Sequence, residues 1–215
     1  MLGVLKAGAA FVFLDAETQP ESRLRSIVGQ TRAKVICSSV SHKQLSRCFI
    51  DKVIVVGPST RQSGHAISFP DVRPSMPVYV CFTSGSTGRP KGAILSHSNV
   101  ASALHHQLGP MGFNRSTRCY DFASFSFDVA IHNMLATLTA GGCLLVPSDS
   151  DRKSRLAASM EEFSTNYVSL TASVARLLDP MDMPSLKTIM LGGEPVTQDV
   201  VDKWWGKVEL INSCG

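Results

Sequence analysis

The sequence YVCFTSGSTGRPKGAILSH spans residues 79–97 and joins an apolar run, ending at Phe82, to a loop of unusual composition. From Thr83 to Lys91 every residue except Pro90 is Thr, Ser, Gly, Arg or Lys. Such a loop exposes many backbone N–H groups and hydroxyls with little side-chain bulk, so it can surround an anion. Lys91 adds a point charge at the end of the loop. The composition predicts a phosphate-binding loop, and a plain solvent-exposed turn between a strand and a helix is the alternative.

The spacing of the loop differs from that of a Walker A motif. In that motif the Lys directly follows Gly and precedes Ser or Thr, whereas Lys91 lies between Pro90 and Gly92. The residues therefore predict a phosphate loop of another kind.

On both sides of the loop, short apolar runs typical of strands alternate with longer runs of helical periodicity. This alternation predicts an α/β fold with mainly parallel sheets and crossover helices. The predicted strands are 10–14, 34–37, 52–56, 78–83, 119–123, 143–146, 167–170, 188–191 and 208–211. The predicted helices are one opened by Pro20, then 99–108, 129–138, 156–163, 174–178 and 197–205. Residues 57–77 are rich in Pro, Gly and Ser and are predicted to form a long surface loop or a joint.

Parallel sheets bind ligands just beyond the carboxyl ends of their strands. The residues with the most distinctive chemistry occur there: the Thr83–Lys91 loop, Asp128, and the segments 192–194 and 212–215 each follow a predicted strand. We therefore expect a ligand site at the carboxyl edge of the sheet.

The charge pattern excludes some functions. The 21 Lys and Arg exceed the 17 Asp and Glu by only four, and the basic residues are scattered, which argues against a nucleic-acid-binding surface. Arg152, Lys153 and Arg155 do cluster, but Asp149 and Asp151 lie beside them, so a solvated loop or helix start is expected. No apolar run approaches the roughly 18 residues that a membrane span needs.

The amino-terminal segment and the cysteines favour a cytoplasmic location. MLGVLKAGAAFVFLD, residues 1–15, has its Lys in the middle of the apolar run, unlike a signal peptide, so a helix end, a Gly turn and a strand are predicted instead. The six cysteines show no zinc-ligand spacing. Several lie in apolar runs, which predicts buried thiols in a reducing compartment.

Five ordered motifs resemble one enzyme family. TSGSTGRPKG, residues 83–92, resembles the signature loop of the adenylate-forming superfamily residue for residue. Its flanks resemble the amino-acid-activating adenylation domains of nonribosomal peptide synthetases. Four further segments resemble motifs of those domains: LKAGAAFVFLD (5–15) the LKAGxAYVPLD core, FDVAIHNMLATLTAGG (127–142) the segment opening with FDxS, LGGEPV (191–196) the GGE turn, and NSCG (212–215) the start of NxYGPTE.

The resemblance implies a two-step reaction. ATP and an amino-acid carboxylate give an aminoacyl-adenylate and pyrophosphate, and the acyl group then passes to a phosphopantetheine thiol on a carrier protein domain. Carried over by motif, the residues that hold the triphosphate of Mg-ATP and the departing pyrophosphate are Thr83, Ser84, Gly85, Ser86, Thr87, Gly88 and Lys91. Thr83 and Lys91 are the expected catalytic residues, Mg²⁺ shares the charge, and no side chain is predicted to ligate the metal directly.

Asp128 is the expected determinant of amino-acid recognition. An α-ammonium taken out of water needs a carboxylate close by, although Asp128 could instead be the N-cap of a helix. His132 lies one helical turn later and faces the same side. The resemblance completes the pocket with Val129, Ser169, Met190, Gly192 and Ser213, for which core packing is the alternative.

The resemblance places four residues on the adenine and ribose side of the nucleotide: Gly193, Glu194, Asn212 and Cys214. An ordinary turn residue is the alternative for Glu194. Cys214 stands where family members carry an aromatic residue that stacks on the base, and a thiol offers far less stacking surface.

By the same resemblance, residues 1–215 are a partial adenylation domain from the middle of the large N-terminal subdomain, with the C-terminal subdomain absent. The expected YxTGD motif and the C-terminal catalytic Lys do not occur, so we expect little or no adenylation by the isolated chain. Two alternatives remain open: a ligase for acyl or aryl acids of the same superfamily, and a non-catalytic truncated protein that binds nucleotide or a partner.

Overall fold

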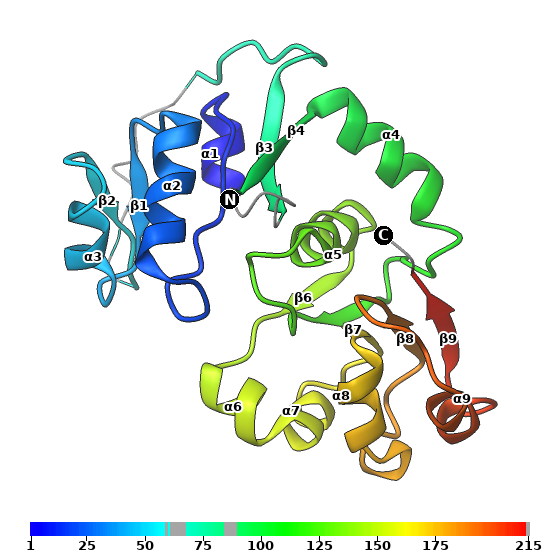
Figure 1. The fold of residues 1–215 in the computed structure, drawn as a ribbon. Coiled ribbons are helices and arrows are strands. Elements are labelled where there is room, and N and C mark those ends of the chain that lie inside the picture. The colour runs from blue at the N-terminus through cyan, green and yellow to red at the C-terminus, as the bar shows by residue number, and fades with distance from the viewer. Residues whose placement is uncertain (59, 61–67, 84–89, 214–215) are drawn as a thin grey trace. The chain divides into compact units, whose positions relative to one another are not determined.

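The computed structural model describes residues 1–58, 60, 68–83 and 90–213 in two compact units, residues 1–98 and 99–215 (Figure 1). Six residues of the predicted site, Ser84, Gly85, Ser86, Thr87, Gly88 and Cys214, lie outside the described residues. The described part of the predicted 57–77 loop contains neither helix nor strand before Pro77.

The first unit contains two small sheets and three helices among its described residues. Its elements are α1 (Leu2–Lys6), α2 (Glu21–Thr31), β1 (Ile36–Ser38), α3 (Lys43–Arg47), β2 (Val53–Val55), β3 (Pro77–Thr83) and β4 (Lys91–Ser96). β1 and β2 pair in parallel, and β3 and β4 pair antiparallel. Pro20 is the N-cap of α2, and the predicted periodic residues Leu24, Ile27 and Val28 are its buried ones.

Two predictions in this unit are wrong. The loop after Thr83 was expected to lead into a helix, but Lys91–Ser96 forms β4. Most β4 side chains are exposed, so backbone pairing with β3 creates this strand without the apolar alternation that reveals a strand in sequence. The predicted strand 10–14 forms only a bridge at Phe11, whose N–H and carbonyl bond to Val78 and Val80.

The second unit confirms the α/β class. Its sheet has the order β6-β5-β7-β8-β9, and all neighbours are parallel. The strands are β5 (Arg118–Tyr120), β6 (Cys143–Leu145), β7 (Tyr167–Leu170), β8 (Thr188–Leu191) and β9 (Glu209–Asn212). The helices are α4 (His97–Gln107), which begins at the end of the first unit, α5 (Asp128–Thr139), α6 (Asp149–Ser154), α7 (Leu156–Glu162), α8 (Ala172–Leu177), the 3₁₀ helix η1 (Pro180–Asp182) and α9 (Gln198–Trp204).

Helices cover both faces of this sheet, as a buried parallel sheet requires (Figure 1). Alternate strand residues divide between two apolar clusters. Val168 and Ile189 belong to a cluster that includes Met160 of α7, Ala175 of α8 and Trp204 of α9. The other cluster contains Cys119, Tyr167 and Met190 from the strands, Ala136 of α5 and Leu104 of α4. Both faces of the sheet are therefore packed. A ligand is expected at the carboxyl ends of the strands, where parallel sheets bind ligands.

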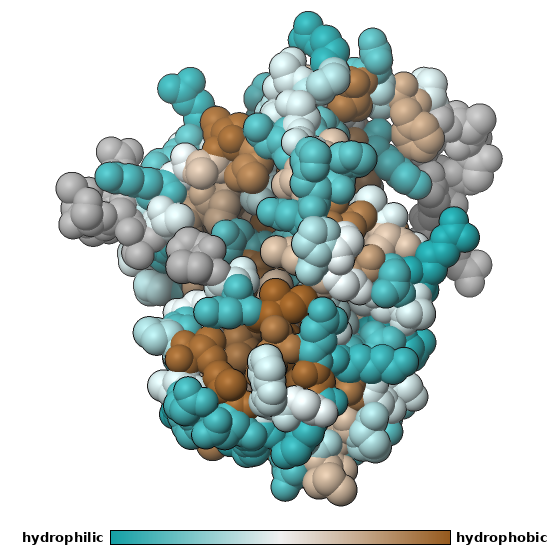
Figure 2. Space-filling view, turned by 90° about the vertical axis from the view of Figure 1, so that its right-hand side faces the viewer, coloured by the Kyte–Doolittle hydropathy of each residue, from teal (hydrophilic) through white to brown (hydrophobic). Residues whose placement is uncertain are grey.

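The edge strand β9 pairs only with β8 among the described residues. Figure 2 looks onto the side of the second unit that carries β9, and apolar side chains gather at its surface. No helix among the described residues is long and apolar enough to cross a membrane.

The prediction of buried thiols is only partly correct. Cys119 is fully buried, and burial raises the pKa of its thiol to about 12. Cys81 is half-buried, whereas Cys37 and Cys143 are exposed because the short strands β1 and β6 turn these side chains toward solvent.

Adjacent tryptophans provide a matched test of the core of the second unit. Trp204 is 0% exposed and its Nε1 donates to the Ala175 carbonyl at 3.0 Å, whereas Trp205 is 74% exposed. We predict that Trp204→Ala lowers the free energy of unfolding by roughly 3–5 kcal/mol, because it leaves a cavity and an unpaired carbonyl. Trp205→Ala should change it by less than about 0.5 kcal/mol. Urea denaturation of both variants checks this, and equal losses would contradict the described packing.

Candidate functional site

The carboxyl edge of the five-stranded sheet collects the predicted substrate-side residues. Helix α5 connects the parallel neighbours β5 and β6, so it begins at this edge, with Asp128 as its first residue. Gly192 follows β8 and Ser213 follows β9. Ser169 and Met190 are register partners in β7 and β8, on the face that α5 covers. The predicted pocket residues thus belong to one edge and one face of the sheet.

Asp128 is exposed in the first turn of α5. The N-cap is Phe127, which makes no side-chain capping bond, so the alternative that Asp128 is the N-cap is wrong. An acidic residue in the first turn interacts favourably with the helix dipole, but the Asp128 carboxylate remains open to solvent. It is therefore accessible to a cation at this edge.

His132 lies one turn after Asp128 and is partly buried. Its Nε2 is buried without a hydrogen-bond partner in the described part of the chain, and its ring meets the Phe113 ring edge-on at 5.8 Å. Burial lowers the pKa of the imidazole, while Asn133 and the Asp128 charge raise it. The net effect is a pKa below the ordinary value, so the ring is neutral near pH 7 and one nitrogen is free to bond a ligand.

The Ser169 hydroxyl is already occupied. Asn133 of α5, 1% exposed, donates to it from Nδ2 at 2.9 Å, and the hydroxyl donates back to Oδ1 at 3.0 Å. Met190 is also buried, and its sulfur accepts a weak bond from the Tyr167 hydroxyl at 3.8 Å. Both residues therefore have structural contacts, in line with the packing alternative. Asn133 was not predicted to belong to the site. Its signal in the sequence was a single amide within the apolar pattern of residues 129–138.

The turn after β8 is tightly built. Gly193 has φ +81°, which favours glycine, and a Cβ on Gly192 would lie 3.1 Å from the Ser213 carbonyl oxygen. Ser213 N–H in turn donates to the Leu191 carbonyl at 2.7 Å. The segments after β8 and β9 are therefore in direct contact, and there is little room for a side chain between them.

The Glu194 carboxylate accepts a hydrogen bond from the Ser173 backbone N–H in α8. This bond, with further contributions from the Ser173 side chain, Thr171 and Arg176, lowers its pKa. The contact agrees with the alternative that Glu194 is a turn residue. Asn212 is exposed at the end of β9, where it pairs in register with Leu191.

Asp121 is a buried acid at this edge that the sequence did not single out. It directly follows β5 and is 1% exposed, and neither carboxylate oxygen has a hydrogen-bond partner among the described residues. Burial raises its pKa to about 6, although the Arg152 charge opposes the shift. The predicted strand 119–123 concealed it, because the strand ends at Tyr120.

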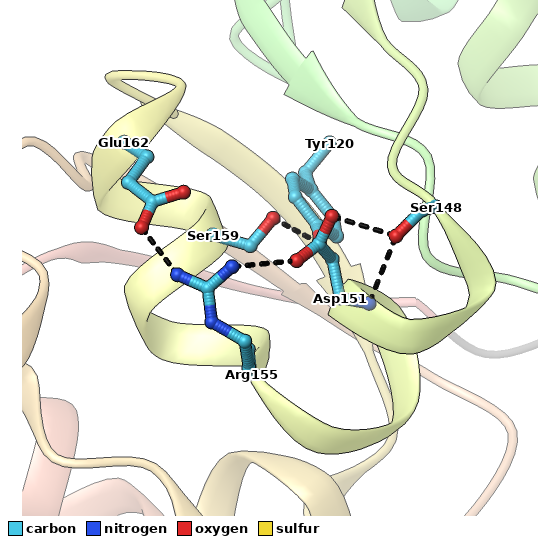
Figure 3. Close-up of polar contacts among 6 residues, drawn as sticks. All are labelled: Tyr120, Ser148, Asp151, Arg155, Ser159 and Glu162. Carbon is cyan, nitrogen blue, oxygen red and sulfur yellow. Dashed lines mark hydrogen bonds and ion pairs between the residues drawn. The ribbon is translucent and has the colours of Figure 1, made fainter.

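A polar network fixes the helices beside Asp121 (Figure 3). The Tyr120 hydroxyl bonds the Ser159 hydroxyl of α7 at 2.9 Å. Arg155, between α6 and α7, donates to Asp151 at 3.0 Å and also to Glu162. Ser148 caps α6 by accepting from the Asp151 N–H at 3.1 Å, so of the two predicted possibilities, a solvated loop or a helix start, the structure has the helix start. The exposed ion pairs add little stability, so the buried hydroxyl pair is the firmer link.

The two ends of the predicted phosphate loop lie together in the first unit. Thr83 and Lys91 are the last register pair of β3 and β4, and both are exposed. Beneath them Phe82 pairs with Gly92, where a Cβ would lie 2.9 Å from the Phe82 ring. A side chain at position 92 would therefore have to displace the Phe82 ring.

Helix α2 contacts the backbone on both sides of that loop. Arg23 Nη2 donates to the Phe82 carbonyl at 3.4 Å, and Gln30 Nε2 donates to the Pro90 carbonyl at 3.2 Å. Neither Arg23 nor Gln30 was predicted to belong to the site. Both bonds join residues about sixty positions apart, which sequence periodicity does not reveal.

Comparison with known proteins gives consistent matches. The sequence profile of a family described as AMP-binding enzyme matches residues 1–214. The chain is 45% identical over 218 residues to Peramine synthetase A of Epichloe festucae strain Fl1, and 45% identical over 222 residues to nonribosomal peptide synthetase ungA of Aspergillus violaceofuscus strain CBS 115571. These matches cover 100% of this chain but only 8% and 2% of the two relatives.

The fold is also similar to solved structures. The AMPPNP-bound nonribosomal peptide synthetase FmoA3 matches with a TM-score of 0.81 at 18% identity, covering 99% of this chain and 24% of that one. At this identity the likeness shows the fold alone.

Asp121 gives a pH test with a definite sign. Its folded pKa, about 6, exceeds the ordinary 3.8, so the folded protein binds this proton more tightly than the unfolded chain does. The Asp121 contribution to stability is therefore present below about pH 4 and is lost as pH rises through about 6. Relative to wild type, Asp121→Asn should gain about 3 kcal/mol in the free energy of unfolding between pH 4 and pH 7.5.

Urea denaturation of wild type and Asp121→Asn across this range measures the difference directly. Asp51→Asn, which changes an exposed acid of the first unit, is the control for the substitution itself. An Asp121→Asn difference that depends on pH no more than that of the control would contradict the raised pKa of Asp121.

Proposed function

Because the chain belongs to the AMP-binding enzyme family, we propose that it forms part of an adenylation domain that activates an amino acid with ATP. The reaction gives an aminoacyl-adenylate and pyrophosphate, as one step of nonribosomal peptide synthesis. The chain spans less than a tenth of the length of the two relatives compared, so the activity belongs to the larger protein. The observation that carries the proposal is the exposed Asp128 carboxylate at the carboxyl edge of the sheet, one turn from the partly buried His132.

In this proposal Asp128 binds the α-ammonium group of the substrate. A carboxylate at the start of a helix pairs with a cation and keeps it from being buried alone. Val129, His132, Met190, Gly192 and Ser213 line the remainder of the pocket, and Ser169 contributes a wall held by Asn133. Within α5, the Nε2 of His132 and the hydroxyl of Thr137 are the buried side-chain polar atoms without a hydrogen-bond partner among the described residues.

The phosphate side of the proposed reaction uses Thr83 and Lys91. A hydroxyl and an ammonium group stand on adjacent strands at the loop end of the β3–β4 hairpin, which suits an anion that carries several oxygens. Ser84, Gly85, Ser86, Thr87 and Gly88 belong to the same proposed loop. The proposed Mg²⁺ is one carried by the ATP phosphates, whose charge it shares.

Gly193, Glu194, Asn212 and Cys214 are proposed for the adenine and ribose side. The Glu194 carboxylate holds α8 through Ser173, so its proposed contribution is to keep the glycine turn in place beside the nucleotide. A phosphopantetheine thiol on a carrier protein domain is the proposed acceptor of the acyl group.

The test is amino-acid-dependent ATP–pyrophosphate exchange by the intact natural protein, with wild type compared with Asp128→Asn. We predict that Asp128→Asn lowers kcat/KM for the amino acid about 100-fold, because a charge pair with the substrate ammonium is lost. The KM for ATP should change less than about two-fold. Asp149→Asn is the matched control, since Asp149 is also exposed and also opens a helix.

Two outcomes separate the other candidates. Equal exchange by wild type with acids that lack the α-amino group would favour an acyl- or aryl-acid ligase. No exchange with any acid would favour a non-catalytic binding protein.

A further inference from the structure

We propose that helix α2 positions the two ends of the phosphate loop, with Gln30 and Arg23 acting as positioning residues for Lys91 and Thr83. This inference rests on the proposed function, because it assigns the role of holding Thr83 and Lys91 in place for ATP. Neither residue belongs to the motif that defines the loop.

The first step of the argument is the position of the two bonds. Arg23 donates to the carbonyl of Phe82, the residue immediately before Thr83, and Gln30 donates to the carbonyl of Pro90, the residue immediately before Lys91. Arg23 and Gln30 are seven positions apart in one helix, which places them two turns apart on the same face. One helix face therefore contacts both ends of the loop.

The second step is the burial of the groups involved. Pro90 and Phe82 are buried, the latter 9% exposed, and a buried carbonyl without a partner costs free energy. Gln30 and Arg23 are themselves half-buried, so water competes less with their bonds than it would at an exposed site. The two side chains thus satisfy specific backbone groups.

The third step is the rigidity of the donor. Leu24, Ile27 and Val28 bury the adjacent face of α2 and are each under 10% exposed. The Gln30 amide also donates to the Ser26 hydroxyl at 3.2 Å, one turn earlier, which orients its nitrogen. The donors are therefore fixed by the helix and its packing.

The fourth step is the weakness of the hairpin by itself. Among the described residues β3 and β4 form a two-stranded sheet that the Phe11 bridge joins at Tyr79, and a two-stranded ribbon by itself is marginally stable in water. Thr83 and Lys91 are its last pair before the connecting loop, so strand pairing supports them from one side. Bonds from α2 to the Phe82 and Pro90 carbonyls restrain this pair, which preorganises a hydroxyl and an ammonium group for a phosphate.

The experiment replaces the hydrogen-bond donor of one side chain by an acceptor without changing the size of the side chain. Gln30→Glu replaces the donor by a carboxylate that repels the Pro90 carbonyl. In the intact natural protein we expect the KM for MgATP in pyrophosphate exchange, and the Kd for AMPPNP, to rise about 10-fold, while the KM for the amino acid changes less than about two-fold. Gln44→Glu adds the same charge at an exposed position of α3 and should leave all three values near wild type.

A second pair of variants guards against a folding defect. Arg23→Gln removes the donor to Phe82, and Arg25→Gln removes an equal charge from a residue of the same helix that contacts Glu21 and the Cys48 carbonyl instead. Arg23→Gln should weaken AMPPNP binding several-fold more than Arg25→Gln, at matched thermal midpoints. A purely structural role would lower the midpoint and affect ATP and amino-acid constants together, which would overturn the inference.

The failure of this inference differs from the failure of the proposed function. If wild type exchanges pyrophosphate and both α2 variants match their controls, the positioning role is wrong and the function stands. If wild type shows no amino-acid-dependent exchange but binds AMPPNP, and Gln30→Glu weakens that binding, the function is wrong and the positioning role stands. If wild type does not bind AMPPNP, both are wrong.

Discussion

Parallel pairing of the strands in the second unit is the constraint from which the candidate substrate site follows. Parallel neighbours need crossover helices, and these helices cover both faces of the sheet, so only its edges remain open. Every strand then delivers its next residues to the same edge. Asp121, Gly192 and Ser213 follow three different strands, and α5 starts there as well. Residues separated by about ninety positions thus lie at the same edge of the sheet because of one hydrogen-bonding pattern.

Hydrogen bonding at this edge distinguishes buried polar groups with a structural role from candidate functional ones. Asn133 and Ser169 satisfy each other with two bonds, so their polarity costs little and joins α5 to β7. The Asp121 carboxylate and His132 Nε2 have no such partner in the described chain, and each has its pKa shifted toward the neutral form by burial. Unsatisfied buried groups lower the stability of a fold, and such groups are most common where a ligand is bound.

The sequence predicted those elements whose pattern reflects burial. Strands 167–170 and 188–191 were predicted to the residue because all their side chains are buried. Helix α5 was predicted to within one residue at each end, and the start of α2 was predicted at Pro20, because one face of each helix is apolar. β4 was missed because it depends on pairing with β3 and buries little. Cys37 and Cys143 lie in apolar runs that predicted buried thiols, but they are exposed. An apolar run does not tell which face of a short strand meets solvent.

Two features of the site were predictable from the sequence: helical periodicity placed Asp128 and His132 one turn apart, as they are in α5, and the strand pattern placed the segments after β8 and β9 at one edge of the sheet. Asp121, Asn133, Arg23 and Gln30 depend on partners that the fold brings together, so no local pattern marks them.

The charged and polar side chains of the two candidate sites are held in place in different ways. At the sheet edge, the packed layers of the second unit hold Asp128 and His132, so packing fixes the positions of these two residues. At the hairpin, β3 is packed but β4 buries little, so part of the free energy needed to hold Thr83 and Lys91 must come from elsewhere. Fixing both ends of a loop removes conformational freedom before a ligand arrives, so less binding energy is lost on ordering. Two side-chain bonds from a well-packed helix provide that restraint while leaving the backbone N–H groups of Thr83 and Lys91 uninvolved in the contacts with α2. A phosphate loop made of small residues needs such outside support, because Gly, Ser and Thr offer an anion many donors but contribute little packing of their own.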